Sequence, residues 1–182
     1  MNVIDMSEKN LAVVLLSGGL DSCVTMAIAR EKHNIAMLHI GYGQRTQTRE
    51  YNPFRSIARF YNIPETRILA IELDFLRKIG GSSLTDHNMP VNKGNTNAGV
   101  PTSYVPFRNT HLLSIAVSWA EASKADSIYI GAVQQDSPDY PDCRAEYYKA
   151  YNKLVEVGTK PSTNIKVVTP LLNMSKSEIV RK

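Results

Sequence analysis

The chain is poor in cysteine, has no long hydrophobic run and carries no strong excess of charge of either sign. Its two cysteines, Cys23 and Cys143, are far apart and form no C-x-x-C pair, so neither a disulfide framework nor a complete zinc site is encoded. The apolar runs are too short for a membrane span or a signal peptide. We therefore expect a cytoplasmic protein that does not contact a membrane.

The charge balance and the length set two further limits. With 21 basic and 17 acidic side chains, the net charge of +4 is a mild excess that contact with nucleotide phosphates would explain. No nucleic-acid partner is expected from it. The 182 residues, 43% of them hydrophobic, can bury a full core, and we expect a single domain over residues 1–182.

One stretch near the N-terminus joins a buried-strand signal to a glycine-rich turn and then to a helix. The apolar run 11–16 is followed directly by Ser17-Gly18-Gly19-Leu20-Asp21-Ser22. Adjacent glycines let the backbone approach a ligand, and the N–H groups at the start of the helix favour an anion, so the stretch predicts a phosphate-binding loop. It lacks the Lys-Ser/Thr of the Walker loop. The alternative is an ordinary strand-to-helix turn.

Strand and helix patterns alternate along the chain. Apolar runs predict strands at 11–16, 35–40, 66–73, 128–132 and 165–169. Helical spacing predicts helices at 21–33, 45–63, 75–79, 109–125 and 144–157, and a last one that begins at Ser175 with Glu178 in capping-box spacing. This pattern predicts an α/β fold with a doubly wound, mainly parallel five-stranded sheet and helices on both faces. Its ligand crevice should lie at the carboxyl ends of the strands.

Several local features leave choices open. Pro53 either kinks a long helix or follows an Asn52 cap as the first residue of a shorter one, which we prefer. Asn109 or Thr110 is expected to cap the helix at 109–125, and Gly158 to end the helix at 144–157. Residues 82–109 read as a long loop, part of which should fold over a ligand. Tyr147, Tyr148 and Tyr151 form a stripe that is either core or a dimer face, and Trp119 is expected in the core.

The chain contains a set of short motifs in one order. They are Ser17 to Ser22, Tyr42-Gly43-Gln44-Arg45, Ser82-Ser83-Leu84-Thr85, Val105-Pro106-x-Arg108-Asn109 and Tyr140-Pro141-Asp142-Cys143-Arg144, followed by Thr169-Pro170-Leu171 and Lys176. The loop alone resembles that of the PP-loop ATP pyrophosphatases, whose fold is of the adenine nucleotide alpha hydrolase-like (HUP) class. The ordered set resembles the 7-cyano-7-deazaguanine synthases of queuosine-precursor biosynthesis within that superfamily.

The resemblance implies a carbon–nitrogen ligase in a PP-loop ATP-binding domain. Such an enzyme uses ATP and Mg²⁺ to convert 7-carboxy-7-deazaguanine and ammonia to 7-cyano-7-deazaguanine through adenylate and amide intermediates, and a homodimer is expected. Two alternatives stay open. One is a PP-loop adenylase that acts on a tRNA base, and the other is a non-catalytic nucleotide-binding module.

The resemblance also assigns roles to residues. The expected ATP-binding residues are Leu16, Ser17, Gly18, Gly19, Leu20, Asp21, Ser22, Tyr42 and Gln44. The expected catalytic residues are Asp21, Arg108, Asp142, Arg144 and Lys176.

The base of the substrate that the resemblance implies is purine-like, and its guanidine-type edge carries N–H donors that need acceptors in the protein. Asp136, Asp142 and Arg144 are the candidates for its recognition, although Asp142 and Arg144 could instead pair with each other. Cys143 is expected to be a buried thiol in preference to a nucleophile, and His39 and His111 are expected to be packed.

The chain departs from the family pattern in three places. Pro138-Asp139 stands where Ser-Gly is common, and Glu50 comes one place later than usual after Tyr42-Gly43-Gln44. Family members also carry four zinc-binding cysteines downstream of the region that matches Lys176. Those ligands are absent from this chain, so no metal-binding residue is assigned and we expect a truncation before the zinc segment.

Overall fold

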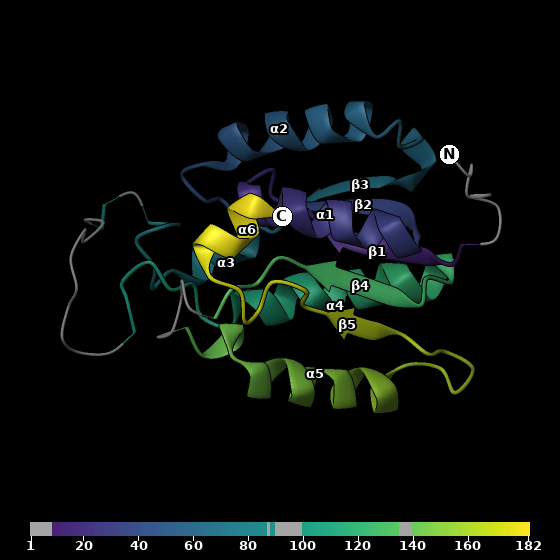
Figure 1. Cartoon of the computed structure of the whole chain (residues 1–182). Coiled ribbons are helices and arrows are strands. Elements are labelled where there is room, and N and C mark those ends of the chain that lie inside the picture. The colour runs from purple at the N-terminus through teal and green to yellow at the C-terminus, as the bar shows by residue number, and fades with distance from the viewer. Residues whose placement is uncertain (1–8, 87, 90–99, 135–139) are drawn as a thin grey trace.

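The computed structural model describes residues 9–86, 88–89, 100–134 and 140–182. Five parallel strands form one sheet in the order β3-β2-β1-β4-β5 (Figure 1). Their bounds are Leu11–Leu15 for β1, Asn34–Gly41 for β2, Ile68–Glu72 for β3, Ser127–Ile130 for β4 and Lys166–Val168 for β5. Strand order reverses between β1 and β4, and this reversal opens a crevice at their carboxyl ends. The predicted sheet is confirmed.

Helices cover both faces of this sheet, as expected (Figure 1). Their bounds are Leu20–Lys32 for α1, Gln47–Phe60 for α2, Asp74–Ile79 for α3, Arg108–Ser123 for α4, Ala145–Gly158 for α5 and Lys176–Arg181 for α6. Helices α1 and α2 pack on one face, and α4 and α5 on the other. Within the described residues, none of the helices has the length and apolar character needed to cross a membrane.

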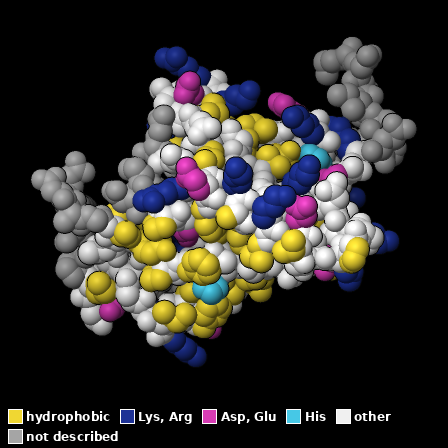
Figure 2. All heavy atoms as spheres, turned by 90° about the horizontal axis from the view of Figure 1, so that it is seen from below, with side chains coloured by type: hydrophobic (Ala, Val, Ile, Leu, Met, Phe, Trp, Pro, Cys, Tyr) yellow, Lys and Arg dark blue, Asp and Glu magenta, His cyan; other side chains and the backbone are white. Residues whose placement is uncertain are grey.

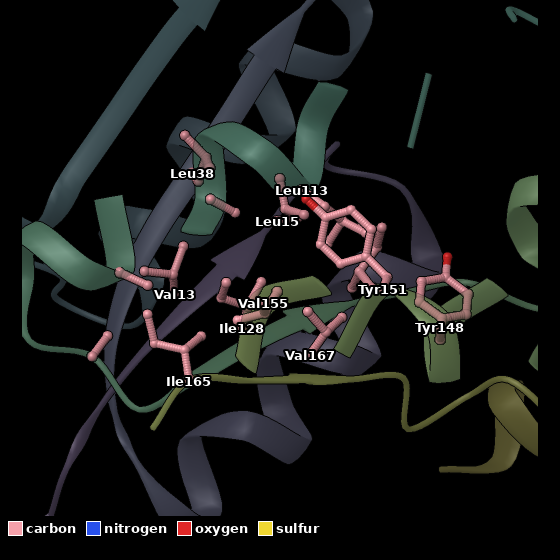
Figure 3. Packing of buried hydrophobic residues seen from close by; sticks show 14 of the residues in the cluster. Val13, Leu15, Leu38, Leu113, Ile128, Tyr148, Tyr151, Val155, Ile165 and Val167 are labelled. Atoms are coloured by element: carbon pink, nitrogen blue, oxygen red, sulfur yellow. The ribbon is translucent and has the colours of Figure 1, made fainter. Parts of the chain in front are cut away.

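Alternating side chains of the central strand feed two separate cores. Ala12 and Val14 of β1 pack towards α1 and α2, whereas Val13 and Leu15 pack towards α4 and α5. Figure 3 shows the second core, where side chains from β1, β2, β4, β5, α4 and α5 converge. Because β1 is buried on both faces, its sequence is continuously apolar rather than alternating. Trp119 packs against this second core, as predicted.

Helix α2 passes through a proline, contrary to our preferred interpretation. It runs unbroken from Gln47 to Phe60, with Pro53 inside it and Thr46 as its N-cap. Phe54 and Ala58, at 0% and 3% exposure, anchor it on the sheet. The free energy gained by burying this face exceeds the cost of a proline inside the helix. The sequence pattern alone does not give either quantity.

Three other element ends differ from the prediction. The N-cap of α4 is Phe107, in the left-handed region at φ 58°, and neither Asn109 nor Thr110 caps this helix. Helix α5 includes Gly158 and is followed by Thr159 as C-cap. Residues 65–67 form a 3-10 turn, so β3 begins at Ile68.

The aromatic stripe of α5 belongs to the core. Tyr148 and Tyr151 are buried, at 3% and 6% exposure, in the cluster shown in Figure 3. On the outer side of the same helix, Leu154 and Val157 are 56% and 79% exposed. Figure 2 shows hydrophobic side chains interleaved with charges of both signs on the face seen from below. The stripe is therefore core, and the expected homodimer stays a prediction.

The outer edge of β5 is occupied by a side-chain amide. The backbone N–H of Lys166 donates to Asp126 O (2.9 Å), so the backbone groups of the next residue, Val167, face away from β4. Asn152 of α5 meets both of them: its Nδ2 donates to Val167 O (3.0 Å) and its Oδ1 accepts from Val167 N (2.8 Å). Helix and edge strand are thereby tied together.

The predicted capping box begins α6. Ser175 accepts from the backbone N–H of Glu178, whose carboxylate accepts in turn from Ser175 N (2.7 Å). Ile179, fully buried, packs with Leu171 and Val133. A helix of this length is marginal alone, so this packing is what keeps it in place.

We predict that Pro53→Ala stabilises the protein by about 1–3 kcal/mol, because alanine restores a backbone donor inside α2 and removes the steric conflict of the proline ring. Alanine keeps the Cβ that lies against the Gly18 backbone. Chemical unfolding measures the change. Ser56→Ala, on the exposed face of α2, is the matched control and should change stability by only a few tenths of a kcal/mol. A Pro53→Ala protein less stable than the parent would contradict the prediction.

Candidate functional site

A cavity of about 390 Å³ lies at the carboxyl ends of β1, β2 and β4. Its floor is apolar, formed by Leu15, Leu38, Ile40, Leu112, Ile130, Ala132 and Val133. Its polar wall is formed by Ser17, Asp21, Ser22, Tyr42, Glu50, Arg108, Asn109 and Lys176. An apolar slot with a few convergent polar groups is typical of a small-molecule site. The strand topology predicted this position.

The loop between β1 and α1 is organised by its two serines. The Ser22 hydroxyl donates to Gly19 O (2.8 Å) and accepts from Gly18 N (3.2 Å). Ser17 Oγ accepts from Gly19 N (3.3 Å). These bonds hold the loop open around the first turn of α1, where backbone N–H groups favour an anion.

Gly18 is the position in this loop that only glycine can occupy. Its φ is +85°, and a Cβ built there would lie 2.5 Å from Glu50 O and 2.9 Å from Pro53 Cβ. The loop therefore rests directly against the backbone of α2. Gly19 differs, because its φ is −79° and a Cβ would meet only Ser17 Oγ at 3.5 Å.

An ion pair joins the loop to the far end of the chain. Lys176 Nζ lies 2.7 Å and 2.9 Å from the two carboxylate oxygens of Asp21. Both residues line the cavity, and the Lys176 side chain is 50% exposed. Such a pair adds little stability, about 0–1 kcal/mol, so its main effect is to place a cation and a carboxylate beside the loop.

Arg108 presents a second cation from the start of α4. Its Nη1 donates to the Tyr42 hydroxyl (3.2 Å), and its guanidinium carbon lies 5.7 Å from the centre of the Tyr42 ring. Burial opposes its charge, but the Tyr42 hydroxyl and the Asp142 carboxylate outweigh burial and raise the pKa of Arg108. The side chain is therefore charged at any physiological pH.

Asp142 lies behind the cavity wall rather than on it. It is 2% exposed, and its Oδ2 accepts from the backbone N–H of Asn109 (2.9 Å). Its Oδ1 has no hydrogen-bond partner among the residues that the structure describes. Arg144 is exposed and makes no ion pair with Asp142 within the described chain, so the alternative in which the two simply pair is not seen.

Cys143 lines the cavity and is 7% exposed. Burial, and after it the Asp142 carboxylate, raises the pKa of the Cys143 thiol. The thiol is protonated at neutral pH, which agrees with the buried-thiol interpretation and not with a thiolate nucleophile. His39 is packed as expected, with Nδ1 bound to Leu16 O (2.9 Å), while His111 lies partly buried between Phe75 and Phe107.

Gln44 supports the site without lining the cavity. Its side chain accepts from Tyr42 N (2.8 Å) and donates to Glu50 (2.9 Å), so both ends of the amide are bound to groups of the protein. Arg45 holds the following loop by donating to Ser83 O (3.0 Å) and to the carbonyls of residues 86 and 89.

The structure brings together most of the predicted site residues. Those that line the cavity are Leu16, Ser17, Gly19, Leu20, Asp21, Ser22, Tyr42, Arg108 and Lys176. Gly18, Gln44 and Asp142 lie behind them, Arg144 is exposed, and Asp136 falls outside the described residues. Sequence reasoning did not assign Glu50 or Asn109 to the site, although both line the cavity. The signal for Asn109 was its place in the Val105-Pro106-x-Arg108-Asn109 motif.

The residues present fit a nucleotide better than they fit zinc. Loop amides, hydroxyls and two cations meet one cavity, which suits phosphates. Asp21 and Glu50 line it as well, and Mg²⁺ bound with phosphates needs only one or two carboxylates. Among the described residues, no group of three or more His, Cys, Asp or Glu could hold a metal ion, so no zinc site is formed by them.

We predict that Gly18→Ala destabilises the ligand-free protein by about 2–4 kcal/mol, because a Cβ is strained at this φ and collides with the Glu50 carbonyl. Thermal unfolding without nucleotide measures it. Gly19→Ala is the matched control and should leave the melting temperature nearly unchanged, since its φ is ordinary. Equal losses in the two variants would overturn the argument.

We predict that Cys143 reacts slowly with iodoacetamide at pH 7 and faster above pH ~8.5, the range in which an ordinary thiol ionises, because its own pKa is raised. Peptide mass spectrometry of the labelled protein gives the rate, with Cys143→Ser as the blank. A Cys143 rate at pH 7 equal to that of a free thiol would contradict the raised pKa, and a faster rate would indicate a thiolate.

Comparisons with known proteins place the chain among its relatives. The sequence profile described as "Queuosine biosynthesis protein QueC" matches residues 11–182. The 7-cyano-7-deazaguanine synthase of Chlorobium luteolum is 55% identical over 172 residues, which cover 93% of this chain and 75% of that protein. That of Chlorobaculum tepidum is 51% identical over 94% of this chain and 75% of its own length.

Solved structures agree on the fold. A predicted subunit of a tRNA methyltransferase from Methanocaldococcus jannaschii aligns over 95% of this chain and 73% of its own, with a TM-score of 0.58 and 16% identity. The U34-tRNA thiolase NcsA from Methanococcus maripaludis aligns over 97% of this chain and 57% of its own, with a TM-score of 0.56 and 16% identity. At this identity the likeness shows the fold alone. The profile match and the identity of the synthases together show that the chain belongs to the QueC family of queuosine biosynthesis proteins.

Proposed function

We propose that this protein is an ATP-dependent ligase that makes 7-cyano-7-deazaguanine from 7-carboxy-7-deazaguanine and ammonia. The observation that carries the proposal is the cavity at the end of β1, where the phosphate loop, Lys176 and Arg108 meet. The synthases to which the chain is more than half identical are named for this product.

The proposed reaction requires that the carboxyl carbon of the substrate be activated twice. A carboxylate is a poor acceptor for ammonia, so its oxygen attacks the α-phosphorus of ATP and pyrophosphate leaves. Ammonia then displaces AMP to give the amide and loses a proton. The amide oxygen then attacks a second ATP in the same way, pyrophosphate leaves and the nitrogen gives up one proton. Loss of AMP and of the second N–H proton leaves the nitrile. One site that binds ATP and places the acyl group at its α-phosphorus serves both rounds.

The loop and the two cations bind and stabilise charge. The N–H groups and hydroxyls of residues 17–22 hold the phosphates that become pyrophosphate. Arg108 and Lys176 stabilise the negative charge that develops as the phosphorus–oxygen bond breaks, and charge-assisted donors aimed at that charge are among the largest contributions to such catalysis. Mg²⁺, when bound with the nucleotide, would neutralise phosphate charge near Asp21. The ion pair between Asp21 and Lys176 must then loosen.

Recognition of the base is assigned to the segment that contains Asp142. Its Oδ1 has no partner among the described residues and could accept from a ring or amino N–H of a deazaguanine. Because Asp142 lies behind the cavity wall, this contact requires the wall to rearrange when the base binds. Arg144 and Asp136 complete the assigned set. The single domain, the homodimer and the cytoplasmic location stay predictions.

The direct test is incubation of the protein with 7-carboxy-7-deazaguanine, ATP, Mg²⁺ and ammonium, followed by mass spectrometry for amide, nitrile and AMP. Both products and AMP are expected. If ATP binds but neither product forms, the proposed function is wrong.

A pair of variants tests whether Lys176 acts in catalysis. Lys176→Met should lower kcat about 100-fold, because it removes a charge beside the transferring phosphates. Lys153→Met is the matched control, since Lys153 pairs with Glu156 (2.8 Å) on the exposed side of α5. A Lys176→Met protein as active as the control would remove Lys176 from the mechanism.

A further inference from the structure

Asn109 is buried at the wall of the cavity, and its backbone N–H and both ends of its side-chain amide form hydrogen bonds. It is 4% exposed. Its backbone N–H donates to Asp142 Oδ2 (2.9 Å), its Nδ2 donates to Asp142 O (2.9 Å), and its Oδ1 accepts from Arg108 Nε (3.3 Å). A second contact of Nδ2 reaches Cys143 Sγ at 3.5 Å.

The two bonds to Asp142 form a clamp between separate segments. One joins the first turn of α4 to a carboxylate, and the other joins the Asn109 amide to the backbone of the 3-10 turn 141–143. Two bonds from one residue fix both the separation and the rotation of the two segments. Asn109 is not the N-cap of α4, because that position belongs to Phe107.

The third bond fixes the direction of the neighbouring guanidinium. Asn109 holds Arg108 at Nε, and Tyr42 holds it at Nη1 (3.2 Å) and by its ring. Nη2 makes no hydrogen bond to the described residues, so its two N–H groups and the second N–H of Nη1 can donate to a ligand. Phe107, at φ 58°, turns the chain so that Arg108 can enter the cavity at the start of the helix.

We infer that Asn109 is a positioning residue that acts through Arg108: it orients the guanidinium towards the nucleotide phosphates and holds that cation in register with the Asp142 segment. The inference rests on the proposed function for its substrate. Misplacement of a charged group by about 1 Å can cost about 100-fold in rate, so the loss of one amide that touches no phosphate is enough to lower activity.

A double-mutant cycle tests whether Asn109 acts through Arg108. The four proteins are the parent, Asn109→Ala, Arg108→Ala and the double variant, each assayed for the ATP dissociation constant, KM and kcat of AMP formation. We expect Asn109→Ala to lower kcat about 10- to 100-fold with a small change in KM. In the Arg108→Ala background the same change should cost less than about threefold. Effects that multiply in both kcat and ATP affinity would overturn the inference.

Asn152→Ala is the control for a purely structural role. The Asn152 side chain also makes three hydrogen bonds, to Tyr148 O (3.1 Å) and twice to Val167, but it lies on the outer edge of the sheet. We expect it to lower the melting temperature as much as Asn109→Ala and to leave kcat within about twofold. If both variants lose activity in proportion to stability, Asn109 has no positioning role.

The outcomes separate this inference from the proposed function. If the parent binds ATP but forms no AMP with the deazaguanine carboxylate, the proposed function fails. The cycle is then read from the ATP dissociation constants alone. Non-additive losses in those constants would still support Asn109 acting through Arg108, and independent losses would refute it.

Discussion

The position of β1 at the centre of a parallel sheet is the constraint on which the site depends. This strand pairs with β2 on one side and β4 on the other, and its residues 12–14 are fully buried. The loop that follows it therefore leaves a fixed point, next to the ends of two neighbouring strands. Because residue 18 is a glycine, that loop lies directly against the backbone of α2, which supports it in addition to the sheet. The cations then come to it from α4 and α6.

This arrangement explains why residues far apart in the sequence act on one cavity. Arg108 enters from the start of α4, and Lys176 from the start of α6, which is held by Ile179 in its own small apolar cluster. Each cation stands in the first turn of a helix whose position is set by burial elsewhere. Core packing thus sets where the backbone of each cation stands, and polar contacts such as those of Asn109 and Tyr42 then orient the Arg108 side chain.

The sequence predicted the parts of the fold that depend on local pattern. The apolar run of β1, the glycine turn that leads into α1 and the Ser175 capping box are each visible in a few adjacent residues, and the structure has all three. Phosphate binding by the glycine turn stays a prediction. The start of α2 and that of α4 could not be predicted. Burial of Phe54 holds the helix that contains Pro53, and the N–H of the left-handed Phe107 donates to the Tyr104 hydroxyl (2.9 Å). In the site, the residues of the loop 17–22 could be identified from their amino-acid types alone. The supporting role of Gln44 and the clamp made by Asn109 depend on partners distant in sequence.

The amide of Asn152 has a consequence for assembly. A parallel sheet with a free edge offers unpaired N–H and C=O groups that another chain can use to add a strand. On the β5 side of this sheet, the groups of Val167 that face outwards already have partners in Asn152. A neighbouring polypeptide that extended the sheet there would first have to displace this side chain. The outer edge of β5 is therefore protected against strand addition, and with it against one route to aggregation.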